Sequence, residues 1–389
     1  MLGSGCNSDA LNTWLTPWRD GATPISVLLV LAGTATAQVE GISAAGATAE
    51  SRLYTALADA ELLLYGPSAK RDWPLPPLNA GVSPALISRV AAEWLGLKPL
   101  VAAVGLPLSP QFPHLRFESA ENGPAACLSS GRAMDYKRVE SLWERGLSFG
   151  QRLKEPLLLA ECVPGGTTTA QAVLTGLGLS VADLISGSGR KPPIALKQTI
   201  VEKGLGSACF RRLPSPQMLL AAVGDPFQPL AAGVVIGAVQ AGQPVFLAGG
   251  SQMVAVLALA LANEDLAGRE LLASGVSLAT TAWLANESVS TKGGRAALDD
   301  LIDKTMDHFG VKIKGVASGL RFEKSRHSRL RDFELGFVKE GVGAGALAFL
   351  AQLRGASIQD LIDGCDQAMD QLGQFGVWPD FGGSRGSWI

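Results

Sequence analysis

The chain has few charged residues for its length. Asp, Glu, Lys and Arg make up 17% of its 389 residues, against about 25% in an average soluble domain, and they leave a formal net charge of −2. A nucleic-acid-binding surface needs a basic stripe that displaces counterions from phosphates, so this balance argues against nucleic acid as a partner. The hydrophobic fraction of 47% argues against intrinsic disorder.

Potential metal ligands are scarce as well. The histidines, His114, His308 and His327, have no histidine or cysteine partner at metal-ligand spacing, and none of the 5 cysteines belongs to a Cys-x-x-Cys pair. We therefore expect no metal site and no disulfide framework, and the cytoplasm is the expected compartment. Long hydrophobic runs are also missing: stretches such as 253–262 fall well short of the ~18–20 residues that span a bilayer, so we expect no membrane insertion.

Glycine is abundant, with 46 residues against an average of about 7%. Four short apolar segments, most of them followed by glycine, predict buried parallel strands: 27–32, 100–104, 156–160 and 245–248. Helix-period segments alternate with them: 48–64, 84–95, 168–177, 216–223 and 253–261. This order predicts an α/β fold, a Rossmann-like parallel sheet flanked by helices, whose ligand would bind at the strand ends. We expect one domain over 1–389, with a small helical subdomain from about 1–24 and 346–389.

The sharpest candidate for a binding loop follows the third predicted strand. Glu161 ends that strand, and Gly165, Gly166, Thr167 and Thr168 lead into a helix. Free backbone N–H groups at a helix start favour a phosphate or carboxylate, and glycine lets the backbone approach a ligand. An ordinary capped helix after a tight turn explains the same residues equally well.

Two further glycine loops have the same form. Gly187, Ser188 and Gly189 precede two basic residues, and Lys197 follows at helical distance; Gly249–Gly250 follows the fourth strand. Both loops are also compatible with ordinary loops that carry solvated charges.

A carboxylate stands beside glycines near the end of the chain. Glu340 is followed by Gly341 and Gly343 and then by an Ala/Leu-rich helix. In a pocket such a carboxylate would have a raised pKa and work as a general base. At the surface it would simply stabilise the start of the helix. Between 321 and 331 lies a basic cluster with one aromatic residue, Phe322, which we interpret as a solvated face or as a lid that reaches a substrate phosphate.

Taken in order, these segments resemble one family. The resemblance rests on LAGTATAQVEGISAAGA, NAGVSPALISRVA, ECVPGGTTTAQAVLTGLG, ISGSGRKPPIALKQ, VGDPFQPLAAGVVIGAVQAGQPVFLAGG and FVKEGVGAGALA, within residues 25–350. They are similar to segments of the nicotinate-nucleotide–dimethylbenzimidazole phosphoribosyltransferases, and more closely to an uncharacterised archaeal and cyanobacterial subgroup. Two departures are Val163-Pro164-Gly165-Gly166 in place of Gly-Ile-Gly-Asn, and Ala248-Gly249 in place of Asp-Gly.

The resemblance implies an activity and a set of roles. The enzymes transfer the phosphoribosyl group of nicotinate mononucleotide to dimethylbenzimidazole, giving nicotinate and α-ribazole phosphate for the lower ligand of cobalamin. Glu340 would be the general base and Glu161 a second carboxylate of the pocket. Phosphate or ribose would be held by the glycine loops and by a lysine: Gly165, Gly166, Thr167, Thr168, Gly187, Ser188, Gly189, Lys197, Gly249, Gly250, Gly341 and Gly343. The resemblance implies no cofactor, no metal and a homodimer.

Other readings stay open at this point. The acceptor could be another azole or a purine, because the acceptor side of the pocket does not align. A non-catalytic nucleotide or sugar-phosphate binding protein, or an assembly protein, would also fit the glycine loops. The presence of both Glu161 and Glu340 favours the enzyme, because a binder of anions gains little from two carboxylates.

Overall fold

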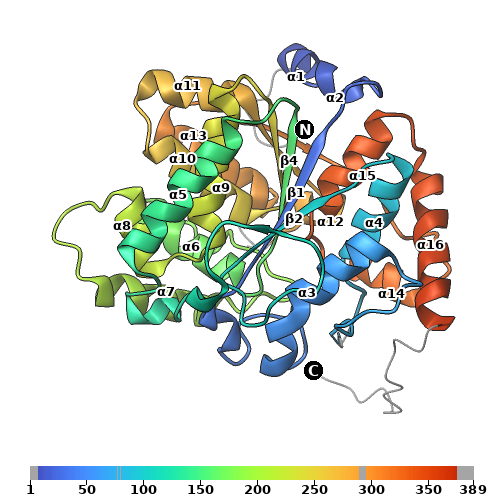
Figure 1. Cartoon of the computed structure of the whole chain (residues 1–389), viewed down its shortest axis with the longest axis horizontal. Helices are drawn as coiled ribbons and strands as arrows, with labels where there is room; N and C mark the ends of the chain where they lie inside the picture. The colour runs from blue at the N-terminus through green and yellow to red at the C-terminus, as the bar shows by residue number, and fades with distance from the viewer. Residues whose placement is uncertain (1–7, 77, 79, 289–294, 375–389) are drawn as a thin grey trace.

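A parallel sheet forms the centre of the structure (Figure 1). The computed structural model describes residues 8–76, 78, 80–288 and 295–374, and within these ranges it has seven parallel strands in one sheet. In spatial order they are β3 (Leu115–Arg116), β2 (Leu100–Val104), β1 (Ser26–Ala32), β4 (Leu157–Cys162), β5 (Val245–Ala248), β6 (Val276–Thr280) and β7 (Lys314–Ala317). The order reverses between β1 and β4, and α/β sheets bind their ligands at such a switch point.

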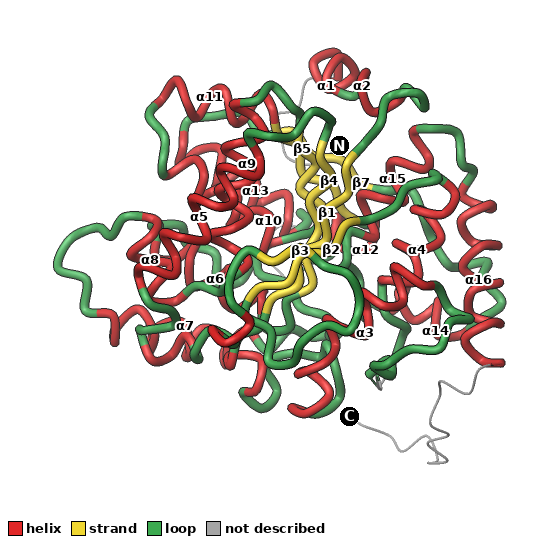
Figure 2. Tube along the Cα trace, viewed as in Figure 1, coloured by secondary structure: helices red, strands yellow, loops and turns green. Residues whose placement is uncertain are grey.

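Helices cover both faces of the sheet, so that the strands lie between two groups of helices in Figure 2. One group consists of α5 (Tyr136–Gly150), α6 (Gly166–Gly176), α7 (Ile194–Ala208), α8 (Pro216–Val223), α9 (Phe227–Gln240), α10 (Ser251–Ala262), α11 (Leu266–Gly275) and α13 (Ala297–Phe309). The other consists of α1 (Ser8–Trp14), α2 (Thr16–Arg19), α3 (Ala49–Tyr65), α4 (Ala85–Trp94), α14 (Ser328–Arg331), α15 (Ala344–Leu353) and α16 (Ile358–Gln374). The short α12 (Ala282–Ala285) follows β6.

The side chains of β1 pack in two hydrophobic cores, one on each face of the sheet. Leu28 and Val30 belong to the core under the first group of helices, whereas Leu29 and Leu31 belong to the core under the second. Both faces of the sheet are buried under helices, so the strand does not alternate between apolar and polar residues, as the sequence predicted. The predicted Rossmann-like parallel sheet is confirmed.

The ends of the described chain pack against each other. The Arg354 guanidinium, just after α15, donates to the backbone oxygen of Trp18 at 2.9 Å, and the Trp18 ring lies 4.3 Å from that of Phe246 on β5. Helix α15 also packs on β5 and β6. A separate helical subdomain at 1–24 and 346–389 stays a prediction, and residues 1–7 and 375–389 of it lie outside the described ranges.

Some of the abundant glycines lie where two helices cross, and not in the loops that follow the strands. Helices α5 and α9 approach so closely that a Cβ on Gly146 would lie 2.2 Å from the Leu230 carbonyl oxygen. A Cβ on Gly233 would lie 2.2 Å from the Trp143 oxygen. The helix backbones therefore touch, and only glycine fits at these positions.

We expect Gly233→Ala to destabilise the protein by about 2–3 kcal/mol, because the added methyl group must push α5 and α9 apart. Gly206→Ala is the control: residue 206 is an exposed position of α7 with no neighbouring atom within 4 Å of an added Cβ. That change should stabilise the protein by about 0.5–1 kcal/mol through helix propensity. Urea unfolding measures the free energy of unfolding of both variants. If Gly233→Ala is as stable as the wild type, helices α5 and α9 do not approach as closely as the structure shows.

Candidate active site

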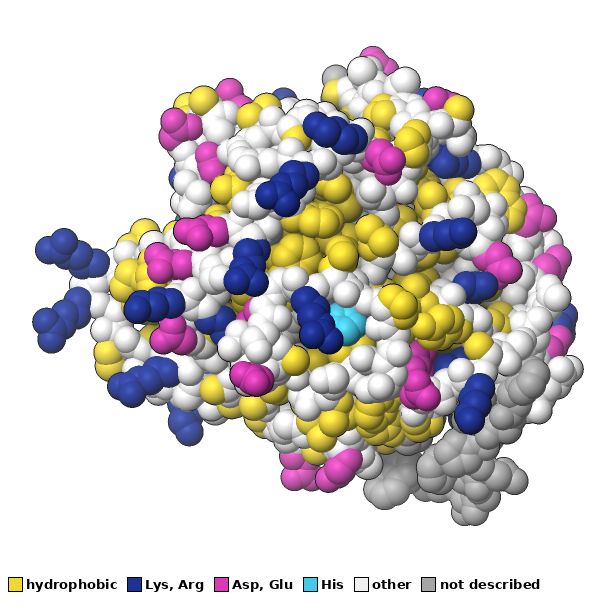
Figure 3. Space-filling view, viewed as in Figure 1, with side chains coloured by type: hydrophobic (Ala, Val, Ile, Leu, Met, Phe, Trp, Pro, Cys, Tyr) yellow, Lys and Arg dark blue, Asp and Glu magenta, His cyan; other side chains and the backbone are white. Residues whose placement is uncertain are grey.

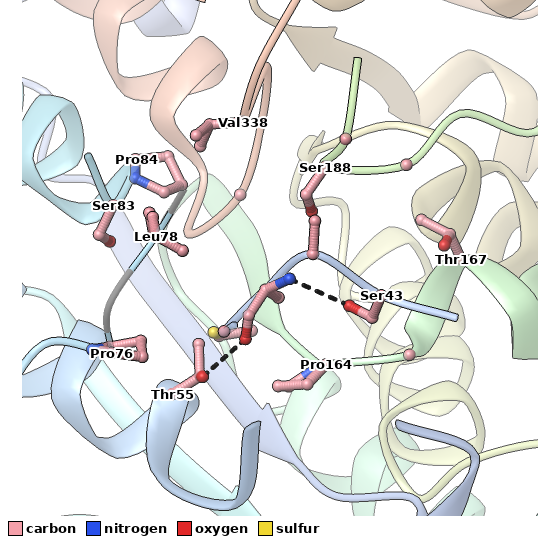
Figure 4. A pocket seen from close by; sticks show the side chains of 18 of the residues that line it. Ser43, Thr55, Pro76, Leu78, Ser83, Pro84, Pro164, Thr167, Ser188 and Val338 are labelled. Carbon is pink, nitrogen blue, oxygen red and sulfur yellow. Dashed lines mark hydrogen bonds between the residues drawn. The ribbon is translucent and has the colours of Figure 1, made fainter. Parts of the chain in front are cut away.

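A cleft of about 370 Å³ opens at the carboxyl end of β4, beside the switch point. Figure 4 shows Pro76, Leu78 and Ser83 on one side of the hollow and Thr167 and Ser188 on the other. We call the second side the hydroxyl end, formed by Thr167 and Gly187–Gly189. The first side is the apolar end, formed by Leu75, Pro76, Leu78 and Val82.

The start of α6 contributes to the hydroxyl end. The helix begins at Gly166, and Gly165 precedes it in the left-handed conformation, with φ of +82°. The first N–H groups of a helix have few partners within the helix, and its dipole is positive at this end, so the position favours an anion. Thr167 turns its side chain to the cleft, whereas Thr168 is fully buried inside α6 and does not line it.

Lys197 lies behind the hydroxyl end rather than in it. Its ammonium donates to Thr167 Oγ1 at 2.9 Å and to the Ser186 backbone oxygen at 2.7 Å, and the side chain is buried. Burial lowers the pKa of Lys197 to about 7, and the nearby Lys339 ammonium adds to this effect. A Cβ on Gly187 would lie 3.5 Å from the ammonium, so the Gly187 backbone lies close to Lys197.

Glu161 lines the cleft on β4 and is half-buried there. Its pKa is raised to about 8, mainly by loss of solvent around the carboxyl group and also by the negative charges of Asp225 and Glu340, while one hydrogen bond from the Val163 N–H opposes the rise. Asp225 itself is fully buried before α9 and accepts hydrogen bonds from Thr169 and Gln252. At neutral pH Glu161 is therefore mostly protonated.

Glu340 lines the same cleft, but its carboxylate is held by four donors. Oε2 accepts from the Thr280 hydroxyl at 2.9 Å and from the Thr281 N–H at 2.7 Å. Oε1 accepts from the Gly341 N–H at 3.0 Å and from the Gly345 N–H at 3.2 Å. Burial raises the pKa of Glu340, and these four hydrogen bonds oppose the rise by stabilising the ionised form.

The loop that carries Glu340 has an unusual backbone. Val338, Lys339 and Val342 all have positive φ, of 64°, 57° and 55°, and Gly341 and Gly343 do as well. A β-branched residue is rarely found in this conformation, which costs about 1–3 kcal/mol and clusters at functional sites. The strain fixes Glu340 between β6 and the start of α15.

A buried ion pair braces this loop, and it was not predicted from the sequence. The Lys339 ammonium bonds to Glu287 and donates to the Gly189 backbone oxygen at 3.1 Å. Ser186 donates to the same Glu287 carboxylate. The pair thus ties residues 186–189 to residues 338–341, and these two segments lie far apart in the sequence.

Asp59 is a further residue of the cleft that was not predicted from the sequence. It lies on α3, is 4% exposed and lines the cleft beyond Cys162. Burial raises the pKa of Asp59 to about 6, although hydrogen bonds from Ser83 and Cys162 oppose the rise. The signal in the sequence was an aspartate among the apolar positions of the predicted helix 48–64.

Several residues predicted to bind phosphate lie elsewhere. Gly250 lines a smaller adjoining hollow that also includes Glu161 and Glu340. The Gly249 N–H donates to the Ala279 backbone oxygen, and Gly249 lines neither hollow. Gly343 is buried against β4, where a Cβ would lie 2.8 Å from that of Ala160. The remaining predicted residues do line the cleft: Gly165, Gly166, Thr167, Gly187, Ser188, Gly189 and Gly341.

The basic cluster at 321–331 makes contacts within the chain. Arg321 pairs with Glu334, and Arg326 pairs with Asp366 and Asp370. Arg329 donates to backbone oxygens of Leu78 and Gly81. On the face shown in Figure 3, Lys and Arg side chains are scattered among Asp and Glu and form no continuous stripe. The cluster thus links α14, α16 and the loop before α4.

Two absences hold for the described part of the chain. No group of three or more His, Cys, Asp or Glu residues there could hold a metal ion. No helix there has both the length and the apolar character needed to cross a bilayer.

The fold and the cleft define an α/β protein with a cleft at the switch point of a parallel sheet. The chain belongs to the phosphoribosyltransferase family, whose family model matches residues 86–283. It is 61% identical over 371 residues to a UPF0284 protein of Prochlorococcus marinus strain MIT 9313, covering 95% of this chain and 92% of that one. It is 41% identical over 369 residues to a UPF0284 protein of Cyanothece sp. strain PCC 7425, covering 93% and 95%.

Two solved structures share the fold. CobT from Thermus thermophilus aligns with a TM-score of 0.57 and 17% identity over 92% of each chain. A nicotinate-nucleotide–dimethylbenzimidazole phosphoribosyltransferase structure from the same organism aligns with a TM-score of 0.57 and 16% identity, over 96% of this chain and 100% of that one. At this identity the likeness concerns the fold alone.

The raised pKa of Glu161 predicts a stability that falls as the pH rises. Below 4.5 the folded and unfolded chains both hold the proton, whereas between 4.5 and about 8 only the folded chain retains it, so ionisation favours unfolding. Glu161→Gln removes this penalty and should stabilise the ligand-free protein at pH 8 by on the order of 4 kcal/mol, with little effect at pH 4.5. Urea unfolding at both pH values tests this, with the exposed Glu270→Gln as control. If Glu161→Gln changes the free energy of unfolding by the same amount at both pH values, the pKa of Glu161 is not raised in the folded protein.

The position of Gly187 at the hydroxyl end predicts how anions bind. In Gly187→Ala the added methyl fits, with its nearest neighbour, the Lys197 ammonium, at 3.5 Å, but it places a side chain on backbone that lines the hydroxyl end. We expect the affinity for ribose 5-phosphate to fall about tenfold, because the methyl group hinders the approach of the phosphate to this backbone and a hydrogen bond to a charged group is worth about 1.5–3 kcal/mol. Calorimetry measures the change, and Gly21→Ala, with no atom within 4 Å of its Cβ, is the control. Unchanged binding in Gly187→Ala would show that the anion does not use this end of the cleft.

Proposed function

We propose that the protein transfers the phosphoribosyl group of nicotinate mononucleotide to dimethylbenzimidazole or a related azole base, giving α-ribazole phosphate and nicotinate. The observation that carries the proposal is the pair Glu161 and Glu340, two carboxyl groups with raised pKa values on one cleft. The cleft has a hydroxyl end suited to a phosphate and an apolar end suited to a flat base. Membership of the phosphoribosyltransferase family supports the same reaction class.

The reaction exchanges one bond to the ribose C1′ for another. The unprotonated ring nitrogen of the azole attacks C1′ with its lone pair, and the bond between C1′ and the nicotinate nitrogen breaks. The bonding electrons leave with nicotinate, which departs as a neutral pyridine ring. The azole ring then carries a positive charge, which it loses with the proton of its other nitrogen. A base beside the acceptor is therefore needed, whereas the leaving group needs no proton.

The two carboxyl groups suit different roles. Glu340 is the candidate base, because its carboxylate accepts four hydrogen bonds that favour the ionised form, which can take up a proton. Glu161, with a pKa of about 8, is mostly protonated and can donate a hydrogen bond to a ribose or base oxygen or nitrogen. Environments that separate the pKa values of neighbouring carboxyl groups commonly assign acid and base. When Glu340 accepts the proton, the Thr280 hydroxyl is the donor that can rotate away.

The hydroxyl end would hold the phosphate of the donor. Thr167 and the Gly187–Gly189 backbone face the cleft, and Lys197 stands behind them at hydrogen-bond distance from Thr167. A bound phosphate would restore the ordinary pKa of Lys197 by favouring its charged form. Lys197 is thus a positioning residue in this proposal. A homodimer and a cytoplasmic location stay predictions.

A non-catalytic nucleotide or sugar-phosphate binding protein is the second candidate. The observation that favours it is the same set of four donors on Glu340, since a carboxylate has about four acceptor sites and all are used. In that case Glu340 would only brace the loop between β6 and α15. Binding of nicotinate mononucleotide without nicotinate release for any base would support this candidate.

The Glu340→Gln variant separates the two candidates. If Glu340 is the base, kcat for nicotinate release should fall by about 10²–10⁴-fold, while the affinity for nicotinate mononucleotide changes by less than about threefold. Nicotinate release is followed by chromatography, and urea unfolding of the variant checks that it is folded. Glu270→Gln on exposed α11 is the matched control. Full activity in folded Glu340→Gln would remove Glu340 as the base.

A further inference from the structure

The apolar end of the cleft contains one feature that a plain hydrophobic pocket would not have. Its lining includes Leu75, Pro76, Leu78 and Val82, which suit the faces of a flat ring. The Asp59 carboxyl group lies among them, deep against β4. An ionised group in such surroundings is costly unless donors satisfy it.

The contacts of Asp59 leave part of its carboxylate unsatisfied. Ser83 Oγ donates to Oδ1 at 2.6 Å, and Cys162 Sγ, a weak donor, donates to Oδ2 at 3.5 Å. Within the described residues no Lys, Arg or His forms an ion pair with it. A carboxylate offers about four acceptor sites, so about two remain for a ligand.

Asp59 and the two glutamates line the same cleft. Asp59 accepts a hydrogen bond from Cys162, whereas Glu161 is influenced by Glu340 and Asp225. A base whose reacting nitrogens face the two glutamates can therefore present another edge to Asp59.

We propose that Asp59 selects an acceptor base with a hydrogen-bond donor on the edge opposite to its reacting nitrogens. The class is a bicyclic heteroaromatic base with an exocyclic amine or a hydroxyl group on the six-membered ring. This inference rests on the proposed transfer reaction and adds the acceptor class to it. The bonds made and broken at C1′ are unchanged, and Asp59 only accepts a hydrogen bond.

Dimethylbenzimidazole is the poorer fit on this account. Its far edge carries two methyl groups, which would exclude water from the carboxylate and give it no donor in return. Leaving a buried acceptor unpaired costs free energy, and sites built to bond an N–H or O–H reject analogues that lack it. An amine or hydroxyl would instead form a charge-assisted hydrogen bond with Asp59.

The test compares bases that differ only in the donor. Adenine is paired with purine, and 5-hydroxybenzimidazole with benzimidazole, while dimethylbenzimidazole is measured alongside them. For each base, kcat/KM for nicotinate release and the dissociation constant by calorimetry are determined with the full chain. We expect the wild type to favour the donor-bearing member of at least one pair by about tenfold or more in both measurements. The pair that shows the preference identifies amine or hydroxyl as the donor.

The Asp59→Asn variant tests the residue itself. We expect the preference to fall below about threefold, mainly through weaker binding of the donor-bearing base, because a neutral amide is a weaker acceptor than a carboxylate. Glu50→Gln, an exposed acid on the first turn of the same helix, is the control and should keep the wild-type preference. If Asp59→Asn does not fold, the wild-type panel still decides whether the donor matters.

The outcomes separate this inference from the reaction. Equal use of both members of each pair, tighter binding of dimethylbenzimidazole, or an undiminished preference in Asp59→Asn would overturn the role of Asp59. Turnover without any preference leaves the transfer reaction intact. Conversely, base binding with the expected preference but no nicotinate release would contradict the transfer reaction and leave the acceptor selection standing.

Discussion

The removal of carboxyl groups from water is the constraint on which the rest of this site depends. Glu161, Glu340 and Asp59 all line one cleft, and burial raises the pKa of each. None of the three forms an ion pair with Lys, Arg or His in the described part of the chain. Only hydrogen bonds offset the effect of burial on these pKa values, and their number differs among the three carboxyl groups. That difference distinguishes the three groups and underlies the role proposed for each.

The fold makes this arrangement possible. Glu161 is the fifth residue of β4, a strand at the switch point that is buried on both faces. Glu340 is held between β6 and the start of α15 by a strained backbone, and the Lys339–Glu287 pair keeps that loop against residues 186–189. Without the burial that the sheet and its helices provide, the carboxyl groups would have ordinary pKa values. Without the braced loop the two glutamates would not share a cleft.

The sequence predicted the parts of the fold that repeat a local pattern. Strands β1, β2, β4 and β5 each contain a short apolar run, and these runs predicted all four. Strands β3, β6 and β7 were missed: β3 has only two residues, β6 directly follows α11, whose C-cap is Val276 itself, and β7 contains Lys314 and Gly315. Helix α5 was missed because its overall polarity hides a narrow apolar face.

The site was only partly predictable for a similar reason. Glycines and hydroxyls in order along the chain indicated the loops, and the roles of Glu161 and Glu340 came from the family resemblance. Nothing local indicated that Thr168 turns inward, that Lys197 stands behind Thr167, or that Gly146 and Gly233 belong to a helix crossing. Asp59 and the Lys339–Glu287 pair depend on contacts between distant segments, which periodicity does not record.

A crystal structure of the protein with nicotinate mononucleotide would show whether the donor binds between the two glutamates. We expect the phosphate to lie at the hydroxyl end, against Thr167 and Gly187–Gly189, with the ribose C1′ between Glu161 and Glu340. The space between C1′ and Asp59 should then remain open for the acceptor base. A nucleotide bound outside this cleft, or bound with its phosphate beside Asp59, would show that the cleft does not work as proposed.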